Sequence, residues 1–418
     1  MSSLPMPMTS TTLLHPRITP EKPELLSPAG DLERLDMAIR YGADAVYLAG
    51  RAFGMRSSAV SFSDEMLTTA VKRAHAAGVK VYVTCNTLPR EEELKVLPAY
   101  LEFLQNAEVD ALIIADLGVL ELARRYAPKS ARHVSTQLGV INSATACALY
   151  EMGADTVVLA RETPLADIRK IRANTPKELR LEAFVHGAMC VSFSGRCLLS
   201  NYMTGRDANR GQCAQPCRWK YHLVEETRPG EYFEISEDGG THIMNSRDMC
   251  MIEHLPELLD AGISSLKIEG RMKSAYYTAV ITNAYRHALD AAIAGRPLDR
   301  LWVEETDRVS HRPYSTGFYF GEPGQYYADA TYFSQADIVA VVERCEPDGM
   351  AVLTQRNKFS RGDELELLPP GGFPLRFRAE ALFDGEENPI EDTRRAMMPF
   401  SMKLPISVPP LTIVRKYR

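Results

Sequence analysis

The chain has 418 residues, which is more than one hydrophobic core usually serves, so we expect two or three domains. Hydrophobic residues make up 45% and charged residues 24%, as is ordinary for a folded soluble protein. The formal net charge of −6 argues against a protein that coats nucleic acid, so any contact with phosphate must come from a local basic patch.

The N-terminal residues 1–22 contain no apolar run of the length that a signal peptide needs. No later run approaches the roughly 20 residues of a membrane helix. We therefore expect a cytosolic protein with no membrane segment and a disordered tail over 1–22. Cytosolic thiols stay reduced, so clustered cysteines in such a chain indicate metal binding or redox chemistry rather than structural disulfides.

Eight short apolar runs, some of which contain β-branched residues, predict buried strands. They are residues 23–30, 44–50, 79–86, 109–116, 132–138, 155–161, 179–187 and 263–270. Amphipathic stretches lie between them, such as the helix predicted after the N-cap residue Ser63. Gly42 and Gly153 each begin a Gly-Ala-Asp tripeptide before a strand, where glycine suits the C-terminal end of a helix.

Strands that alternate with helices indicate a parallel sheet, and the number of strands favours a TIM-like (β/α)8 barrel over residues 23–300. A doubly wound open sheet is the alternative. From about residue 335 the pattern changes to strands separated by Pro and Gly turns, which predicts a small antiparallel β-barrel domain over 335–418. This domain either braces the large one or contacts RNA. Residues 301–334 are expected to form a linker.

Active sites of parallel α/β folds lie at the C-terminal ends of the strands, and polar side chains gather at these positions. They are Asn86, Asp116, Ser135, Gln137, Arg161, Glu162, His186, Lys267, Glu269 and Arg271. The alternative is that several of them cap helices or form ion pairs. A buried Lys267 beside Glu269 and Arg271 is costly unless it is paired or bound to an anion.

Four of the eight cysteines fall in one stretch just after the seventh predicted strand. Cys190, Cys197, Cys213 and Cys217 are separated by six, fifteen and three residues, within a cysteine-rich insertion expected over 187–240. Four thiolates suit either a tetrahedral zinc ion or an iron–sulfur cluster, and the wide first spacing modestly favours the cluster. The alternative, four unrelated buried thiols, is disfavoured by their Gly, Arg, Ser and Gln neighbours.

The run "EAFVHGAMCVSFSGRCLLS", residues 182–200, resembles the signature of the collagenase-like peptidase family. The runs "NYMTGRDANRGQCAQPCRWKY" and "SLKIEGRMKS" extend the likeness, and so does the N-terminal "PELLSPAGDLERLDMAIRYGADAVY". Within the family, the likeness is greatest to prephenate-dependent tRNA uridine hydroxylases, which make 5-hydroxyuridine at the wobble position. The resemblance implies a 4Fe-4S cluster, prephenate as co-substrate and the tRNA anticodon loop as partner.

Carried over to this chain, the resemblance makes Cys190, Cys197, Cys213 and Cys217 the cluster ligands, with Cys250 as a possible substitute for Cys217. Prephenate carries two carboxylates, which guanidinium groups bind bidentately. We expect substrate binding by Arg161, Arg271, Asn86 and Gln137, with Lys267 as a further carboxylate ligand. Candidate catalytic residues are Glu182, His186, Lys267 and Glu269.

The stretch 190–220 is basic in an otherwise acidic chain. It holds Arg196, Arg206, Arg210, Arg218 and Lys220 against a single acidic residue, Asp207. Trp219 and Tyr202 are available to stack on an unpaired base, as in proteins that bind single-stranded RNA. We therefore predict an RNA-binding patch here, with a solvated loop as the alternative.

Three other functions stay open: a peptidase, a hydroxylase of ribosomal RNA and a non-catalytic iron–sulfur scaffold. The peptidase is disfavoured because the sequence has neither the His-Glu-x-x-His motif of zinc proteases nor a Gly-x-Ser-x-Gly nucleophile elbow.

Overall fold

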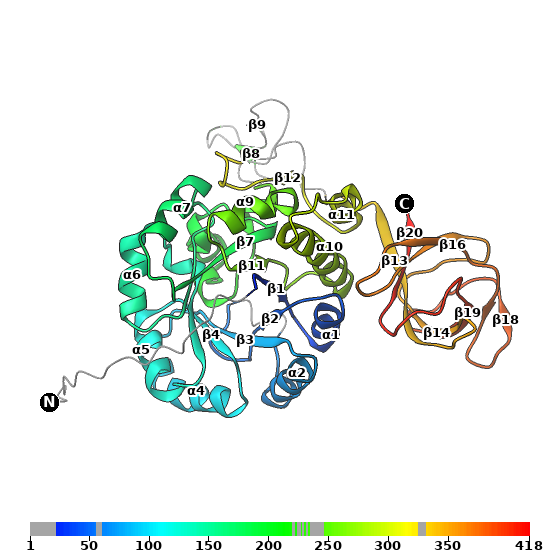
Figure 1. Cartoon of the computed structure of the whole chain (residues 1–418), viewed down its shortest axis with the longest axis horizontal. Helices are drawn as coiled ribbons and strands as arrows, with labels where there is room; N and C mark the ends of the chain where they lie inside the picture. Colours follow the sequence, from blue (N-terminus) through cyan, green and yellow to red (C-terminus); the bar gives the residue numbers. More distant parts are fainter. Residues whose placement is uncertain are drawn as a thin grey trace.

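The computed structural model describes residues 22–55, 61–219, 246–324 and 332–418, with 222–223, 227, 230 and 233–234 in between. Eight parallel strands form a closed barrel surrounded by helices (Figure 1). The barrel strands are β1 (Glu24–Pro28), β2 (Ala45–Leu48), β3 (Lys80–Cys85), β4 (Ala111–Ile114), β5 (Ala131–Val134), β6 (Thr156–Val158), β7 (Arg180–Ala188) and β11 (Ser265–Ile268). Strand β11 pairs with both β1 and β7 and so closes the barrel. The predicted TIM-like barrel is confirmed, and the open-sheet alternative is wrong.

The helices of the barrel begin and end where local sequence signals place them. They are α1 (Leu32–Arg40), α2 (Asp64–Ala76), α3 (Glu91–Leu94), α4 (Leu97–Asn106), α5 (Leu117–Tyr126), α6 (Ser143–Glu151), α7 (Leu165–Ala173), α9 (Leu255–Asp260) and α10 (Ala275–Ile293). Ser63 caps α2 by accepting a hydrogen bond from the Met66 amide at 3.2 Å. Gly42 and Gly153 follow α1 and α6 with φ of 102° and 98°, a region that favours glycine. None of the helices in the described ranges has both the length and the apolar composition needed to cross a bilayer.

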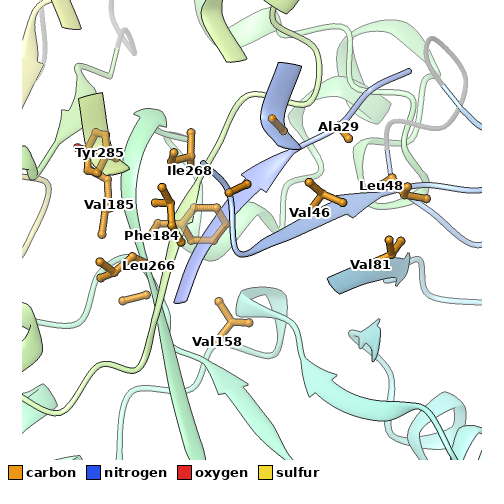
Figure 2. Packing of buried hydrophobic residues seen from close by; sticks show 14 of the residues in the cluster. Ala29, Val46, Leu48, Val81, Val158, Phe184, Val185, Leu266, Ile268 and Tyr285 are labelled. Atoms are coloured by element: carbon orange, nitrogen blue, oxygen red, sulfur yellow. Dashed lines mark hydrogen bonds between the residues drawn. The ribbon is translucent and has the colours of Figure 1, made fainter. Parts of the chain in front are cut away.

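Apolar side chains alternate between two cores along the barrel strands. The larger core lies between strands and helices, where Val46, Val81, Val185 and Leu266 are buried (Figure 2). A smaller one fills the barrel interior, and Tyr47, which follows Val46, belongs to it. Polar residues that occupy inward-facing positions at the strand ends, such as Lys267, therefore line the mouth of the barrel.

Most barrel strands are shorter than the predicted runs, and the fifth strand ends four residues before its predicted end. The run 132–138 was predicted as a strand, but β5 ends at Val134 and Thr136–Leu138 form a 3-10 turn. The Ser135 hydroxyl accepts a hydrogen bond from the Gln137 amide at 3.4 Å, and this local bond favours the turn over further pairing. The turn places Gln137 at the mouth of the barrel.

The segment after α10 packs on the barrel while it leads to the second domain. It contains α11 (Arg300–Glu305) and β12 (Tyr314–Ser315), and β12 pairs with β10 (Asp248–Cys250), which itself extends the sheet beside β7. The buried Arg312 guanidinium donates from Nε to Asp248 Oδ1 at 2.9 Å. Residues 325–331 of this segment lie outside the described residues.

The C-terminal domain is the predicted antiparallel β structure, in eight strands of order β16-β15-β20-β13-β14-β19-β17-β18. Its strands are β13 (Ala336–Cys345), β14 (Met350–Gln355), β15 (Glu364–Leu368), β16 (Leu375–Arg378), β17 (Leu382–Phe383), β18 (Pro389–Ile390), β19 (Pro399–Lys403) and β20 (Ile413–Tyr417). Figure 1 shows this domain beside α10 and α11, curled on itself.

A fully buried ion triad joins the domains. The Arg415 guanidinium of β20 donates to Glu305 of α11 at 2.6 and 2.8 Å, and its Nε donates to Glu366 of β15 at 2.8 Å. All three side chains are at most 5% exposed. Arg415 therefore bridges two buried carboxylates across the interface, and Glu366 is also 3.5 Å from the exposed Arg376.

Replacing Arg415 by Met is expected to lower the free energy of unfolding by about 3–5 kcal/mol, because Glu305 would stay buried without its cation and Glu366 would keep only its 3.5 Å contact with the exposed Arg376. Urea unfolding of the whole chain measures the change. Arg418→Met is the matched control, since Arg418 pairs with Asp337 at the surface and its loss should cost less than about 1 kcal/mol. Equal effects of the two variants would contradict this role for the triad.

Candidate active site at the mouth of the barrel

A cavity of about 140 Å³ opens at the C-terminal ends of the barrel strands and is covered by the cysteine-rich insertion. Besides Ser135, ten of the residues predicted to be catalytic, substrate-binding or metal-binding line it. They are Asn86, Gln137, Arg161, Lys267, Glu269, Arg271, Cys190, Cys197, Cys213 and Cys217. Residues at the C-terminal ends of β3, β5, β6 and β11 thus lie around the same cavity as four cysteines of one insertion. Tyr47, Thr84 and Phe184 also line the cavity but were missed, because their sequence context is that of ordinary strand residues.

The cysteine-rich insertion turns back on itself through short helices. They are the 3-10 turns η2 (Phe193–Gly195), η3 (Ala208–Arg210) and η4 (Pro216–Arg218) and the helix α8 (Leu199–Thr204). The Asn209 side chain bonds both the amide and the carbonyl of Cys197, at 3.2 and 3.0 Å, and the Ser200 hydroxyl accepts from the Ala214 amide at 3.0 Å. These contacts bring Cys197 and Cys213 to the same cavity although fifteen residues separate them.

Two carboxylates of the barrel anchor the insertion. Glu162 accepts hydrogen bonds from the amide and the hydroxyl of Ser194, both at 2.7 Å. Glu93 of α3 accepts from the two terminal nitrogens of Arg210, at 2.6 and 2.9 Å. The hydrogen bond from Arg210 lowers the pKa of Glu93 to about 2, so this pair stays charged at neutral pH.

The four cysteines are free thiols. Burial raises the pKa of Cys217, and Cys190, Cys213 and Cys197 raise it further, whereas Arg218 opposes the shift. Backbone amides approach two of the sulfurs: Leu199 donates to Cys197 Sγ at 3.3 Å, and Gln215 donates to Cys213 Sγ at 3.4 Å. Such amides favour thiolates that carry negative charge.

Four cysteine thiols around one cavity form a donor set that is chemically suited to an iron–sulfur cluster. Within the described parts of the chain, no group of three or more His, Cys, Asp or Glu side chains is arranged to hold one metal ion. Cys250 does not line that cavity; its thiol lies 3.8 Å from the Tyr285 hydroxyl, and burial raises its pKa to about 11.

Three cations surround the floor of the cavity. Lys267 Nζ lies 2.8 Å from Glu182 Oε1 and 4.6 Å from the centre of the Tyr47 ring. Arg161 contacts Glu269 at 3.4 Å, stacks over Phe184 and donates to the Ala188 carbonyl at 2.9 Å. Arg271 donates to the Thr84 hydroxyl at 3.0 Å. Glu182 lies beneath Lys267 and is completely buried, so it positions this ammonium rather than lining the cavity.

Two amides complete the polar wall. Asn86 Nδ2 donates to Gln137 Oε1 at 2.9 Å, and Asn86 Oδ1 accepts from the Met55 amide at 3.0 Å. The Gln137 amide also contacts the Met55 sulfur. The cavity therefore combines cations, amides and four thiols, a lining suited to an anionic molecule with additional oxygen atoms.

His186, a predicted catalytic residue, does not line the cavity. Its Nδ1 lies 3.2 Å from the Tyr285 hydroxyl and its ring packs against Tyr314. A β-bulge explains this position: Phe184 pairs with Lys267, but the next residue of β11 pairs with His186. The extra residue, Val185, reverses the alternation of β7 and turns His186 away from the barrel interior.

The buried His186 should make stability depend on pH. Burial lowers its pKa to about 3 from an ordinary 6.5. Below pH 6.5 the unfolded chain binds a proton that the folded chain does not, so stability is complete above this pH and falls toward pH 3. Between pH 7 and pH 5 the expected loss from this residue is about 2 kcal/mol. Urea unfolding of wild type and His186→Phe measures it; equal pH slopes would contradict it.

The predicted RNA-binding residues divide into two groups. Arg196, Arg206 and Trp219 are exposed around the insertion. Arg210 instead forms the ion pair with Glu93, and Arg218 donates to the Tyr332 hydroxyl at 2.8 Å. Lys220 lies outside the described residues. Tyr202, at 87% exposed, adds an aromatic surface beside Arg206.

An eight-stranded parallel barrel with a charged cavity at the C-terminal ends of its strands has the architecture of the (β/α)8 enzymes, whose active sites occupy this place. The chain belongs to peptidase family U32: the family model matches residues 30–329, and the model of the U32 C-terminal domain matches residues 334–415.

Three proteins with similar sequences have names that refer to RNA hydroxylation or to hydroxylated RNA. The chain is 38% identical to "tRNA hydroxylation protein P1" of Bacillus subtilis, over 97% of this chain and 98% of that protein. It is 37% identical to "tRNA hydroxylation protein P" of Escherichia coli, over 88% and 91%. A third relative, a 23S rRNA 5-hydroxycytidine synthase of Escherichia coli, is 39% identical over 69% of this chain and 44% of that protein.

Proposed function

We propose that this protein is an RNA hydroxylase that converts the wobble uridine of tRNA to 5-hydroxyuridine, with prephenate as co-substrate and a 4Fe-4S cluster as cofactor. The observation that carries the proposal is one cavity lined both by four cysteines and by three cations. Two relatives that match nearly the whole chain are named for tRNA hydroxylation, which favours RNA as the substrate.

Cys190, Cys197, Cys213 and Cys217 would hold the cluster, which supplies electron-transfer or Lewis-acid chemistry when bound.

The cations would bind the co-substrate. Prephenate has two carboxylates, and Arg161, Arg271 and Lys267 offer guanidinium and ammonium donors on one side of the cavity. Asn86 and Gln137 provide amide groups for the remaining oxygen atoms. Glu269, which also lines the cavity, is the carboxylate placed to hold or move a proton during the reaction.

A peptidase is the second candidate, because the family carries that name. Hydrolysis of an amide needs an activated nucleophile or metal-bound water, and a cysteine nucleophile is usually paired with a histidine base. No histidine is among the described residues that line the cavity. The chemistry of the lining therefore favours hydroxylation.

Mass spectrometry of tRNA digests from a strain that lacks the gene tests the proposal. We expect 5-hydroxyuridine derivatives to disappear and to return with the wild-type gene. Unchanged tRNA would contradict the proposal; hydroxycytidine lost from ribosomal RNA instead would move the substrate to rRNA. A peptidase would degrade gelatin even with the four cysteines replaced, and a non-catalytic scaffold would bind iron and leave RNA nucleosides unchanged.

A further inference from the structure

A second cavity, of about 480 Å³, lies on the outer side of the cysteines. Cys190, Cys213, Cys217 and Glu269 line both this outer cavity and the one in the barrel mouth. The other walls of the outer cavity come from the end of β7, from the insertion, from the loop after β11 and from Ser310 and Tyr332. The cysteines are thus accessible from two sides, by two ligands.

Three cations line the outer cavity: Arg206, Arg218 and Lys273. Glu269 is the one carboxylate among the described residues that line it, and Glu269 already contacts Arg161. The outer cavity therefore carries a positive excess, which suits an anion.

Two of these cations are held around one aromatic ring. Lys273 Nζ lies 4.6 Å from the centre of the Tyr332 ring and donates to the Ser310 carbonyl at 2.9 Å. Arg218 donates to the Tyr332 hydroxyl at 2.8 Å and to Gln215 Oε1 at 3.1 Å. Tyr332 itself is 37% exposed. Cations fixed beside an exposed ring match what single-stranded nucleic acid offers, namely phosphates alternating with stacking bases.

We propose that the outer cavity is the binding site for the sugar–phosphate backbone of single-stranded RNA, with Lys273, Arg218 and Arg206 on phosphates and Tyr332 as a stacking surface. This inference rests on the proposed function and specifies where its RNA binds. Lys273 and Tyr332 become RNA contacts that no motif indicated. The target base would then face the cysteines from outside, while the dicarboxylate occupies the smaller cavity within the barrel.

The size and setting of the two cavities support this division. The inner cavity, with its buried Lys267 and Arg271, suits a small dicarboxylate. The outer one is larger and is lined by Arg206, which is exposed, with Trp219 next in the chain to Arg218. A segment of nucleic acid needs this larger volume and a cation at its exposed edge.

The test measures binding of an anticodon stem–loop RNA to the iron-loaded protein by fluorescence anisotropy at several salt concentrations. Lys273→Met should weaken binding by about tenfold and reduce the slope of log affinity against log salt by roughly 0.7. Lys273→Arg should keep both. Lys129→Met, an exposed position at the start of β5 and therefore at the opposite end of the barrel, should change neither.

The thermal midpoint of Lys273→Met shows whether this variant remains folded. If it is folded and its slope of log affinity against log salt is unchanged, the inference is overturned. A raised KM for prephenate with unchanged RNA affinity would also overturn it, and would assign the outer cavity to the carboxylate instead. Hydroxylation by the wild-type preparation separates the two claims. If the wild type hydroxylates tRNA while the slope stays unchanged, only this inference fails; if the slope falls but no hydroxylation occurs, the proposed reaction fails and the RNA site stands.

Discussion

Serine in place of Cys190, Cys197, Cys213 or Cys217 is expected to reduce the iron content of anaerobically purified protein and to lower tRNA hydroxylation by at least about a hundredfold. All four thiols line one cavity, so each would supply one ligand that serine replaces poorly. Iron analysis, the visible absorption spectrum and hydroxylation of tRNA measure the outcome. The thermal midpoint should be recorded for each variant, because loss of a cluster also destabilises the fold around it.

Cys345→Ser is the matched control, since Cys345 lies in strand β13 of the C-terminal domain, where its thiol contacts the Glu346 carbonyl at 3.5 Å. It should keep both iron and activity. Cys250→Ser separates the two possible ligand sets: retained iron in this variant is expected, because Cys250 packs against Tyr285 outside the cavity. Iron retained in Cys217→Ser but lost in Cys250→Ser would reverse the assignment.

Lys267→Met is expected to impair the protein in two separable ways. It leaves the Glu182 carboxylate buried without its cation, which should cost about 3–5 kcal/mol of stability. It also removes a charged donor from the cavity, which should raise the KM for prephenate by roughly 10- to 100-fold.

The double variant Lys267→Met with Glu182→Leu separates these effects. Removing both charges should restore most of the stability, because a buried ion pair can often be replaced by apolar residues of similar volume. The KM should stay raised, since the donor is still missing. Urea unfolding and steady-state kinetics give the two quantities, and a double variant that recovers a normal KM would show that Lys267 has only a structural role.

The barrel could be predicted because each of its strands and helices is marked by residues within or next to it in the sequence. Each strand is a short apolar run between turn signals, and Gly42 and Gly153 mark helix ends by themselves. The topological rule for parallel strands then placed Asn86, Arg161, Lys267 and Arg271 at one end, where the structure finds them around one cavity.

Contacts between distant segments were not predictable in this way. The position of His186 depends on a bulge that appears only in the pairing of β7 with β11. Arg210 was assigned to phosphate because nothing in the sequence connects it to Glu93. Lys273 and Tyr332 come from different parts of the chain and meet only through the packing of the segment that follows α10.

The most direct test of the proposed function is a reaction with purified components. Iron-loaded protein, prephenate and unmodified tRNA should together yield 5-hydroxyuridine at the wobble position, detected by mass spectrometry of nucleoside digests. Omission of prephenate, or the Cys213→Ser variant, should give none. A full yield of 5-hydroxyuridine without prephenate or without iron would contradict the account, as would no product from the complete mixture.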